Sequence, residues 1–239
     1  MAMIQQASPL RPLDGIVVVL VGTDGSENAG SIARLCGNFG CALRFVDVHA
    51  RLDCHDAWKM ANPCIDILDQ APRLATLQEA IADCAMVVAT SGKIAEAMEQ
   101  DPIDVARAAR LWPAPGERCA IVFGNERTGL SVGDAALCQR VVRLPTPGPA
   151  DSINLASAVA CTLTLFAEAG RARSTPRASQ SAREALLQTF EDKLMERGFY
   201  KGATPTTFRP RLQEIVAKMD ITTRDAELLA HLLKALAER

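Results

Sequence analysis

Short apolar runs, each followed by a glycine-rich or polar stretch, recur through the first 170 residues of the chain. The runs are rich in Val, Ile and Leu and do not alternate with polar residues, which is typical of strands buried on both faces of a parallel sheet. They occupy residues 16–21, 43–48, 86–89, 119–123 and 141–144. Because helical periodicity fills the segments between them, the pattern predicts an α/β domain with a mainly parallel sheet.

The segments between these runs carry recognisable helix signals. Asn28 precedes an apolar stripe at helical spacing and is suited to cap that helix. A capping box over residues 76–79 predicts a helix that ends around Cys84. Further helices are expected within 49–63, from Asp101–Pro102, shortly after Leu130 and over 155–167, the last with Asp151 or Ser152 as its N-cap.

The composition changes after residue 170. Residues 171–181 are rich in Arg, Ser, Thr and Pro, which is typical of a linker. Beyond them, apolar residues at helical spacing predict three amphipathic helices, with Gly198 ending the first and Thr222 capping the third. The sequence therefore predicts an α/β domain over 1–170, a linker over 171–181 and a helical domain or dimerisation arm over 182–239.

The composition is that of a globular protein, with 239 residues of which 49% are hydrophobic. No apolar run is long enough to span a membrane, and the first residues lack the pattern of a signal peptide, so we expect a cytoplasmic protein. The eight cysteines include no Cys-x-x-Cys pair and are expected to be reduced core residues. His49, Cys54, His55 and Cys64 match no zinc-binding spacing, so no metal is expected.

Charge is divided unevenly along the chain, although the net charge is only −2. Residues 1–170 contain 13 Lys and Arg against 19 Asp and Glu, whereas residues 171–239 contain 13 against 9. This excess of positive charge suggests that the tail contacts a polyanion. A solvated helical surface explains the same charges equally simply.

Three loops that follow predicted strands carry small, polar or proline residues, over 90–92, 124–130 and 144–154. Ligands of open α/β sheets bind beyond the carboxyl ends of the strands, where these loops begin. A glycine such as Gly124 allows the backbone to approach a ligand closely, and it presents Glu126 and Arg127 at the rim. The three loops are suited to enclose a small polar ligand.

The motifs of several enzyme classes are absent or misplaced. Neither a Gly-x-Gly-x-x-Gly fingerprint nor a phosphate-binding P-loop occurs. Residues 129–133 match the Gly-x-Ser-x-Gly pattern of a nucleophile elbow, but the preceding strand ends several residues earlier, near Phe123. With histidines only at 49, 55 and 231, this match is read as chance.

Three motifs together carry a specific resemblance. Asn28-x-Gly-x-x-x-Arg34 comes first, followed by Val122-Phe-Gly-x-Glu126-x-x-Gly-Leu130 and Ser152-x-Asn154-Leu-Ala-x-Ala-Val159. Their order and spacing, which cover residues 16–170, resemble the SPOUT superfamily of RNA 2′-O-methyltransferases. Within it the chain is most similar to the TrmH/TrmJ group, because the tail, especially Gly198-Phe-Tyr, resembles the extension of the tRNA-modifying members.

The resemblance implies a fold, a cofactor and partners. The carboxyl half of the α/β domain is expected to form a trefoil knot that binds S-adenosylmethionine. The implied partners are tRNA, modified at the ribose of nucleotide 32 in the anticodon loop, and a second copy of the chain, with sites formed at the subunit interface. No DNA and no membrane is implied.

The resemblance also implies roles for individual residues. Arg34 would be the catalytic residue, aided by Asn28, Glu126, Ser152 and Asn154. The cofactor would contact Thr90, Ser91, Gly92, Gly124, Leu144, Asp151, Ser152 and Ile153. Because a guanidinium keeps its proton at neutral pH, binding of a phosphate or of the developing oxyanion suits Arg34 better than a general-base role, which stays open.

One position departs from the resemblance and leaves alternatives open. Lys93 and then Ile94-Ala-Glu96 follow the Thr-Ser pair, where the tRNA-modifying members carry arginines. This departure bears on which nucleotide is modified and not on the reaction type. The alternatives are 2′-O-methylation of ribosomal RNA and a non-catalytic RNA-binding protein on the same scaffold.

Overall fold

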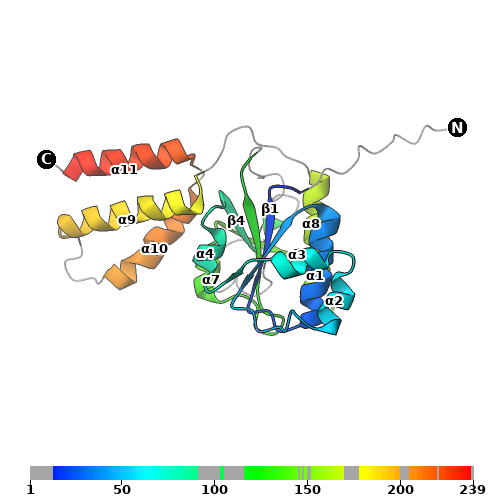
Figure 1. Ribbon diagram of the computed structural model, residues 1–239. Helices are drawn as coiled ribbons and strands as arrows, with labels where there is room; N and C mark the ends of the chain where they lie inside the picture. The colour runs from blue at the N-terminus through cyan, green and yellow to red at the C-terminus, as the bar shows by residue number, and fades with distance from the viewer. Residues whose placement is uncertain are drawn as a thin grey trace.

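The computed structural model describes residues 13–90, 103–104, 116–144, 146, 148–149, 152–169, 178–199, 205–219 and 221–237. These residues form an α/β domain and a group of three helices that extends from one side of it (Figure 1). Within this part of the chain, no helix has the length and apolar character needed to cross a lipid bilayer.

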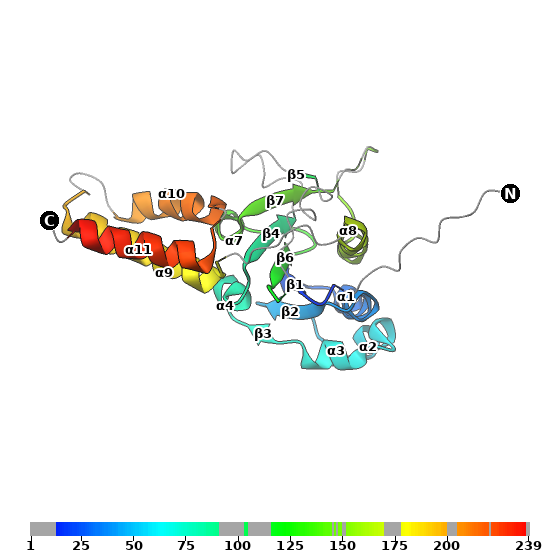
Figure 2. The same ribbon diagram turned by 90° about the horizontal axis from the view of Figure 1, so that it is seen from above.

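A seven-stranded sheet with only parallel pairs lies at the centre of the α/β domain, in the order β3-β2-β1-β6-β4-β7-β5 (Figure 2). The prediction of a parallel sheet is therefore confirmed. The strands are β1 (Ile16–Val21), β2 (Ala42–Val46), β3 (Arg73–Leu74), β4 (Met86–Thr90), β5 (Ile103–Asp104), β6 (Cys119–Phe123) and β7 (Arg140–Arg143). The hydrophobic pattern did not predict β3 and β5, each of two residues.

Helices cover both faces of the sheet, which explains why its strands lack alternation. Ile16, Val18 and Leu20 of β1 belong to one buried cluster, whereas Val17 and Val19 belong to the other. One face packs against α1 (Ser26–Phe39), α2 (His55–Ala61), α3 (Ile65–Gln70) and α8 (Leu155–Ala169), and the other against α4 (Leu77–Ile81) and α7 (Val132–Ala136). Both faces of a central strand therefore require apolar side chains.

Several sequence-based expectations need correction. The backbone at Gly25 is the N-cap of α1, and Asn28 lies inside the first turn rather than at the cap. Ile103–Asp104 form β5, so the helix predicted from Asp101–Pro102 is wrong at these two residues. The cysteines are all free thiols, but Cys161 on α8 is exposed and is not a core residue. The Thr76 capping box is confirmed, although α4 already ends at Ile81.

The three tail helices pack against one another around α9. They are α9 (Gln180–Glu196), α10 (Pro205–Lys218) and α11 (Thr223–Ala237). Leu186 of α9 meets α11 in one small apolar cluster, and Leu187 meets α10 in another. Gly198 ends α9 with a φ of 63°, and the Thr222 hydroxyl accepts a hydrogen bond from the Asp225 amide at the start of α11, as predicted.

The start of α9 is attached to the α/β domain by hydrogen bonds. The Gln180 amide donates to Cys84 O over 2.7 Å, and the Ser181 amide donates to Ala82 O over 3.1 Å. The Arg183 side chain is 2% exposed and donates from Nη1 to Ala85 O over 2.6 Å. Residues 180 and 181 therefore belong to α9 and its contact with the domain.

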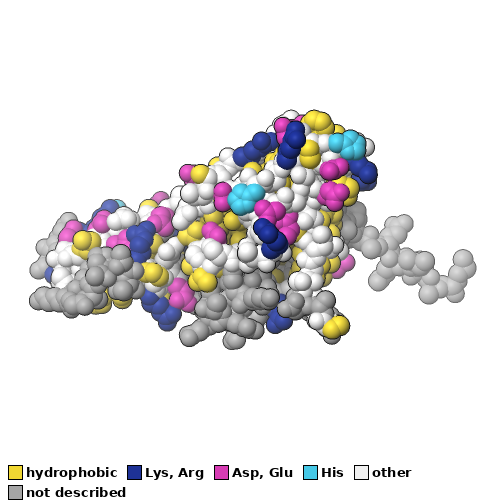
Figure 3. Space-filling model, turned by 90° about the horizontal axis from the view of Figure 1, so that it is seen from below, with side chains coloured by type: hydrophobic (Ala, Val, Ile, Leu, Met, Phe, Trp, Pro, Cys, Tyr) yellow, Lys and Arg dark blue, Asp and Glu magenta, His cyan; other side chains and the backbone are white. Residues whose placement is uncertain are grey.

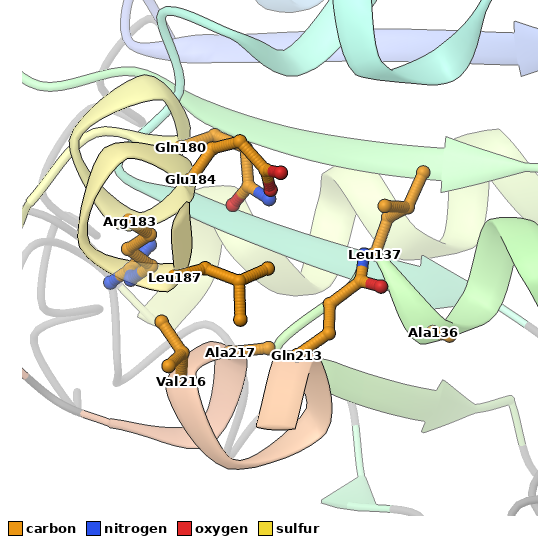
Figure 4. Close-up of a pocket in the computed structure, with 9 residues that line it drawn as sticks. All are labelled: Ala136, Leu137, Gln180, Arg183, Glu184, Leu187, Gln213, Val216 and Ala217. Atoms are coloured by element: carbon orange, nitrogen blue, oxygen red, sulfur yellow. The ribbon is translucent and has the colours of Figure 1, made fainter. Parts of the chain in front are cut away.

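Gln139, just before β7, extends this contact into the sheet. Its side-chain oxygen accepts a hydrogen bond from the Val87 amide of β4, and its Nε2 donates to Gln180 Oε1 over 3.1 Å. Figure 4 shows Leu187 pointing into the narrow space between α9, α10 and α7, beside Leu137 and Gln213. The hollow left there measures only about 10 Å³, so this junction is packed and offers no room for a ligand.

Candidate active site

A cleft opens where the carboxyl ends of β4, β6 and β7 lie side by side. Thr90 of β4 stands opposite both Phe123 of β6 and Val142 of β7, so the following loops leave the sheet at one level. The cleft has a volume of about 240 Å³. It is lined by Thr90, Phe123, Gly124, Asn125, Glu126, Arg127, Thr128, Gly129, Val142, Arg143, Leu144, Thr146, Ser152, Ile153, Leu155 and Ala158. Residues of all three loops singled out in the sequence thus share one cleft.

The loop after β6 forms a tight closed turn on one side of this cleft. Asn125 and Gly129 exchange two backbone hydrogen bonds, of 3.2 and 2.8 Å. The Asn125 side-chain oxygen accepts hydrogen bonds from the amides of Arg127 and Thr128. A Cβ at Gly124 would lie 2.2 Å from the Gly129 carbonyl carbon, so only glycine permits this closure. The turn therefore presents Glu126 and Arg127 in a fixed arrangement.

Glu126 joins this turn to the start of α1. Its carboxylate accepts hydrogen bonds from the amides of Asp24 and Gly25, both over 3.1 Å, and from Asn28 Nδ2 over 3.0 Å. Burial raises the pKa of Glu126, but the hydrogen bonds from Asn28 and from the backbone amides outweigh it and hold the pKa below its usual value. Glu126 is therefore an anion at neutral pH, placed at the helix N-terminus, where negative charge is favoured.

Asn28 connects Glu126 to the third motif. Asn154 Nδ2 donates to Asn28 Oδ1 over 3.1 Å, and Asn154 Oδ1 accepts a hydrogen bond from the Ser157 amide in the first turn of α8. Asn154 thus caps α8, and the expectation that Asp151 or Ser152 would do so is corrected. Glu126, Asn28 and Asn154, one from each motif, form a continuous hydrogen-bonded chain.

The structure separates Arg34 from these residues. Arg34 is exposed on α1, about two turns beyond Asn28. It is not part of the cleft lining, and it forms no hydrogen bond or ion pair with another described residue. Its guanidinium is free to meet a partner molecule.

The residues expected to contact a cofactor fall into two groups. Thr90, Gly124, Leu144, Ser152 and Ile153 line the cleft. The Thr90 hydroxyl already donates to Val122 O over 3.0 Å. The other three, Ser91, Gly92 and Asp151, lie outside the described residues.

Sequence reasoning missed Asp24, which holds several loops together. Its carboxylate accepts hydrogen bonds from Asn125 Nδ2 over 2.9 Å and Arg127 Nη2 over 3.2 Å, and it meets His49 Nδ1 at 3.1 Å. The hydrogen bonds from Asn125 and His49 lower the pKa of Asp24. The one sequence signal was its place in a polar, glycine-rich stretch after β1. Figure 3, which views this edge, shows a histidine among acidic and basic side chains.

One other sequence pattern has a structural explanation. The Ser131 hydroxyl donates to Asp134 Oδ2 over 2.6 Å and accepts from the Asp134 amide, so Ser131 caps α7 and is no nucleophile elbow. Among the described residues, no cluster of three or more His, Cys, Asp or Glu side chains is arranged to hold a metal ion.

Comparison with known proteins agrees with this arrangement. A model of the SpoU rRNA Methylase family matches residues 15–164. The tRNA (cytidine-2′-O-)-methyltransferase TrmJ of Methanocaldococcus jannaschii is 32% identical over 185 residues, which cover 74% of this chain and 80% of that protein. The tRNA (cytidine/uridine/adenosine-2′-O-)-methyltransferase TrmJ of Pseudomonas aeruginosa is 34% identical over 149 residues, which cover 62% of this chain and 58% of that protein.

A solved structure extends the similarity beyond the α/β domain. The crystal structure of TrmJ from Z. mobilis superposes with a TM-score of 0.76 at 28% identity, over 92% of this chain and 98% of that one. A span of this size is longer than residues 1–170, so it includes at least part of the tail. The chain therefore belongs to the SpoU rRNA methylase family and, within it, is similar to the TrmJ tRNA 2′-O-methyltransferases.

Proposed function

We propose that this protein transfers a methyl group from S-adenosylmethionine to a ribose 2′-hydroxyl of tRNA, in the cytoplasm and as a homodimer. The proposed target is a cytidine or uridine at nucleotide 32 of the anticodon loop. The observation that carries the proposal is the hydrogen-bonded chain of Glu126, Asn28 and Asn154, which joins the three motifs beside the cleft. The similarity to proteins named as tRNA 2′-O-methyltransferases supports the choice of tRNA.

The lining of the cleft fits S-adenosylmethionine. Leu144, Ile153 and Leu155 offer an apolar wall to a flat ring, and the glycine-bearing turn at 124–129 offers backbone groups to its polar edges. In the proposal Thr90, Gly124, Leu144, Ser152 and Ile153 hold the cofactor together with Ser91, Gly92 and Asp151, within a trefoil knot. When bound, S-adenosylmethionine supplies the electrophilic methyl group.

The residues of the chain then have to orient the RNA and stabilise charge. A guanidinium remains protonated at neutral pH, so Arg34 binds the phosphate of the target nucleotide and stabilises the developing 2′-oxyanion, while the proton of the hydroxyl leaves to water. Glu126 uses its carboxylate to fix the turn after β6 against α1, and Asn28 and Asn154 fix the start of α8 in the same way. Ser152 faces the cleft as a neutral hydrogen-bonding group.

The position of Arg34 supports a site shared between two copies of the chain. Arg34 is exposed and is not part of the cleft lining in its own chain. In a homodimer whose clefts lie at the interface, Arg34 of one protomer serves the cleft of its partner. Mixing R34A with a variant altered in the cleft tests this, because one intact site in a mixed dimer restores methylation.

The proposal is tested by incubating the full-length protein with labelled S-adenosylmethionine and with tRNA or ribosomal RNA. We expect label in tRNA, and nucleoside mapping that finds a 2′-O-methylated cytidine or uridine at position 32. The rRNA arm is needed because the family is described as rRNA methylases. Label only in ribosomal RNA would replace the substrate, and RNA binding without any transfer would favour a non-catalytic module.

A further inference from the structure

Asp24 is the point where three loops at the carboxyl edge of the sheet are joined. Its carboxylate accepts hydrogen bonds from the side chains of Asn125 and Arg127 in the loop after β6, and its own amide donates to the Glu126 carboxylate over 3.1 Å. On its other side the carboxylate meets His49, which follows β2. The arrangement of the Glu126 turn relative to α1 therefore depends on what binds Asp24.

His49 lies between two carboxylates. Nδ1 is 3.1 Å from Asp24 Oδ1, and Nε2 is 3.3 Å from Asp47 Oδ2. A neutral imidazole has one N–H and can donate to only one of them, whereas an imidazolium donates to both. The geometry thus suits the charged ring.

The backbone holds His49 in this position. The amides of His49 and Ala50 both donate to Thr23 O, over 3.0 and 2.8 Å, which ties the loop after β2 to the loop after β1. Asp47 has a φ of 45°, in the left-handed region, and this turn brings its carboxylate to the second ring nitrogen. The His49 side chain remains 53% exposed, so protons reach it freely.

We propose that His49 is a positioning residue which, as an imidazolium, fixes Asp24 and thereby holds Asn125, Glu126 and Arg127 in their arrangement beside the cleft. RNA methylation then depends on the protonation of His49. The inference rests on the proposed function, since its main readout is methyl transfer. The charged groups that face His49 are Asp24 from the loop after β1 and Asp47 from the loop after β2, with Arg127 from the loop after β6 bound to the same Asp24 carboxylate.

The direction of the pH effect follows from the surroundings of the ring. The hydrogen bond to Asp24 and the charge of Asp47 raise the pKa of His49 above 6.5, against a smaller opposing effect of desolvation. The pair with Asp24 is therefore complete below the usual histidine pKa and is lost as the pH rises through the raised value. The advantage that His49 gives must decline in that same range.

The first experiment compares the wild type with H49Q, which keeps a hydrogen-bond donor but never carries the charge. We expect kcat/KM for RNA to be about two- to fivefold higher in the wild type near pH 6, with the ratio falling towards one near pH 9. Taking the ratio removes the pH dependence of the chemical step, which both proteins share. H55Q is the matched control, because among the described residues His55 meets only the neighbouring Asp56, at 3.5 Å, and should keep the wild-type profile.

A second variant separates positioning from a merely structural role. D47N removes the second carboxylate and suits the left-handed backbone at this position, because asparagine adopts it readily. The ratio of kcat/KM between D47N and H49Q should therefore fall at a lower pH than the ratio between the wild type and H49Q, while its plateau at low pH is kept. A pH-independent deficit in H49Q, or an unmoved transition in D47N, would overturn the inference.

A nuclear magnetic resonance titration of the full-length chain tests the same inference without activity. The side-chain signals of Asn125 and Arg127 should titrate with the midpoint of the His49 ring in the wild type and lose this transition in H49Q. Failure of those signals to follow His49 would overturn the inference even if the protein methylates RNA. Absence of methyl transfer from an otherwise responsive protein would count against the proposed function alone.

Discussion

Hydrogen bonds surround both ends of β4, but at one end they attach a helix and at the other they lie beside the cleft. At the amino end, the Arg183 side chain donates to the carbonyl of residue 85 and the Gln180 backbone amide donates to the carbonyl of residue 84, at a buried contact with α9. At the carboxyl end, Thr90 lines the cleft, beside the exposed hydrogen bond that Asn28 donates to Glu126. A strand of five residues thus separates a docking contact from a site.

The difference lies in burial. Removing a donor from a buried carbonyl costs about 1–3 kcal/mol, because the carbonyl has no water to replace it. An exposed charged pair contributes about 0–1 kcal/mol, since water competes for both partners. Changes at the amino end should therefore reduce stability, whereas changes at the carboxyl edge should reduce activity and leave stability almost unchanged.

The largest effect is expected from R34A. Loss of the charge that stabilises the oxyanion should lower kcat/KM by about 10²- to 10³-fold. Cofactor affinity, measured by calorimetry, should stay near wild type, because Arg34 is not part of the cleft lining. R73A, at an exposed position on β3, is the control. Cofactor binding lost together with activity would make Arg34 a structural or cofactor residue instead.

R183M should weaken the contact between α9 and the amino end of β4 and leave the site at the carboxyl end unchanged. Methionine keeps an apolar stem but cannot donate to Ala85 O, so the free energy of unfolding should fall by about 1–3 kcal/mol. Denaturant unfolding measures this loss, with R224M at an exposed position of α11 as the control. Activity per folded molecule should be unchanged. A large loss of activity at full stability would contradict the separation of the two ends.

The sequence was sufficient for elements whose signals are local. Residues 16–21 and 119–123 match β1 and β6 residue for residue, because each run is apolar on both faces. The cap at Asn28 was misassigned because this side chain binds Glu126, 98 residues away. The contact between Asp24 and His49 was missed for the same reason, because no local sequence pattern predicts a contact between loops that follow two different strands. The short strand β5 lies where proline chemistry favoured a helix.

Acid should lower the stability of the region at the amino end of β4 through Asp83, which precedes this strand. Arg44 binds both Asp83 oxygens, at 2.7 and 2.9 Å, and together with Arg118 it holds the pKa of this carboxyl well below its usual range. A lowered pKa means that the contribution is present above the usual value and is lost as the pH falls below it. At neutral pH the free energy of unfolding of the wild type should exceed that of D83N by up to about 1 kcal/mol, since the Asp83 carboxylate is partly exposed.

Urea unfolding of both proteins between neutral and acidic pH measures the Asp83 contribution. The difference in unfolding free energy should shrink progressively below about pH 4. D53N is the control, because within the part of the chain that the structure describes Asp53 meets only Arg51, in an exposed pair. A difference between wild type and D83N that does not change with pH would mean that Asp83 acts through packing rather than through its charge.

The smallest effect is expected where the tail charges are already paired. Between residues 171 and 211 there are nine Lys and Arg against four Asp and Glu, which predicted contact with a polyanion. In the described part of this segment, Arg183 is buried, while Arg209 pairs with Glu184 and Glu191, and Lys193 with Glu196. These side chains already serve the fold. The polyanion prediction then depends mainly on basic residues outside the described ranges.

R211Q tests this on an exposed arginine, since Arg211 pairs with Glu214 over 2.7 Å. Removing one protein–phosphate ion pair changes the slope of log affinity against log salt by about 0.7 to 0.9. We expect R211Q to change the slope for tRNA binding by much less than this amount. Replacing Arg171, Arg173 and Arg177 of the predicted linker by glutamine should make the slope shallower if the tail binds RNA. An unchanged slope in that triple variant would leave the tail as a helical cap, held by its buried contacts at the amino end of β4.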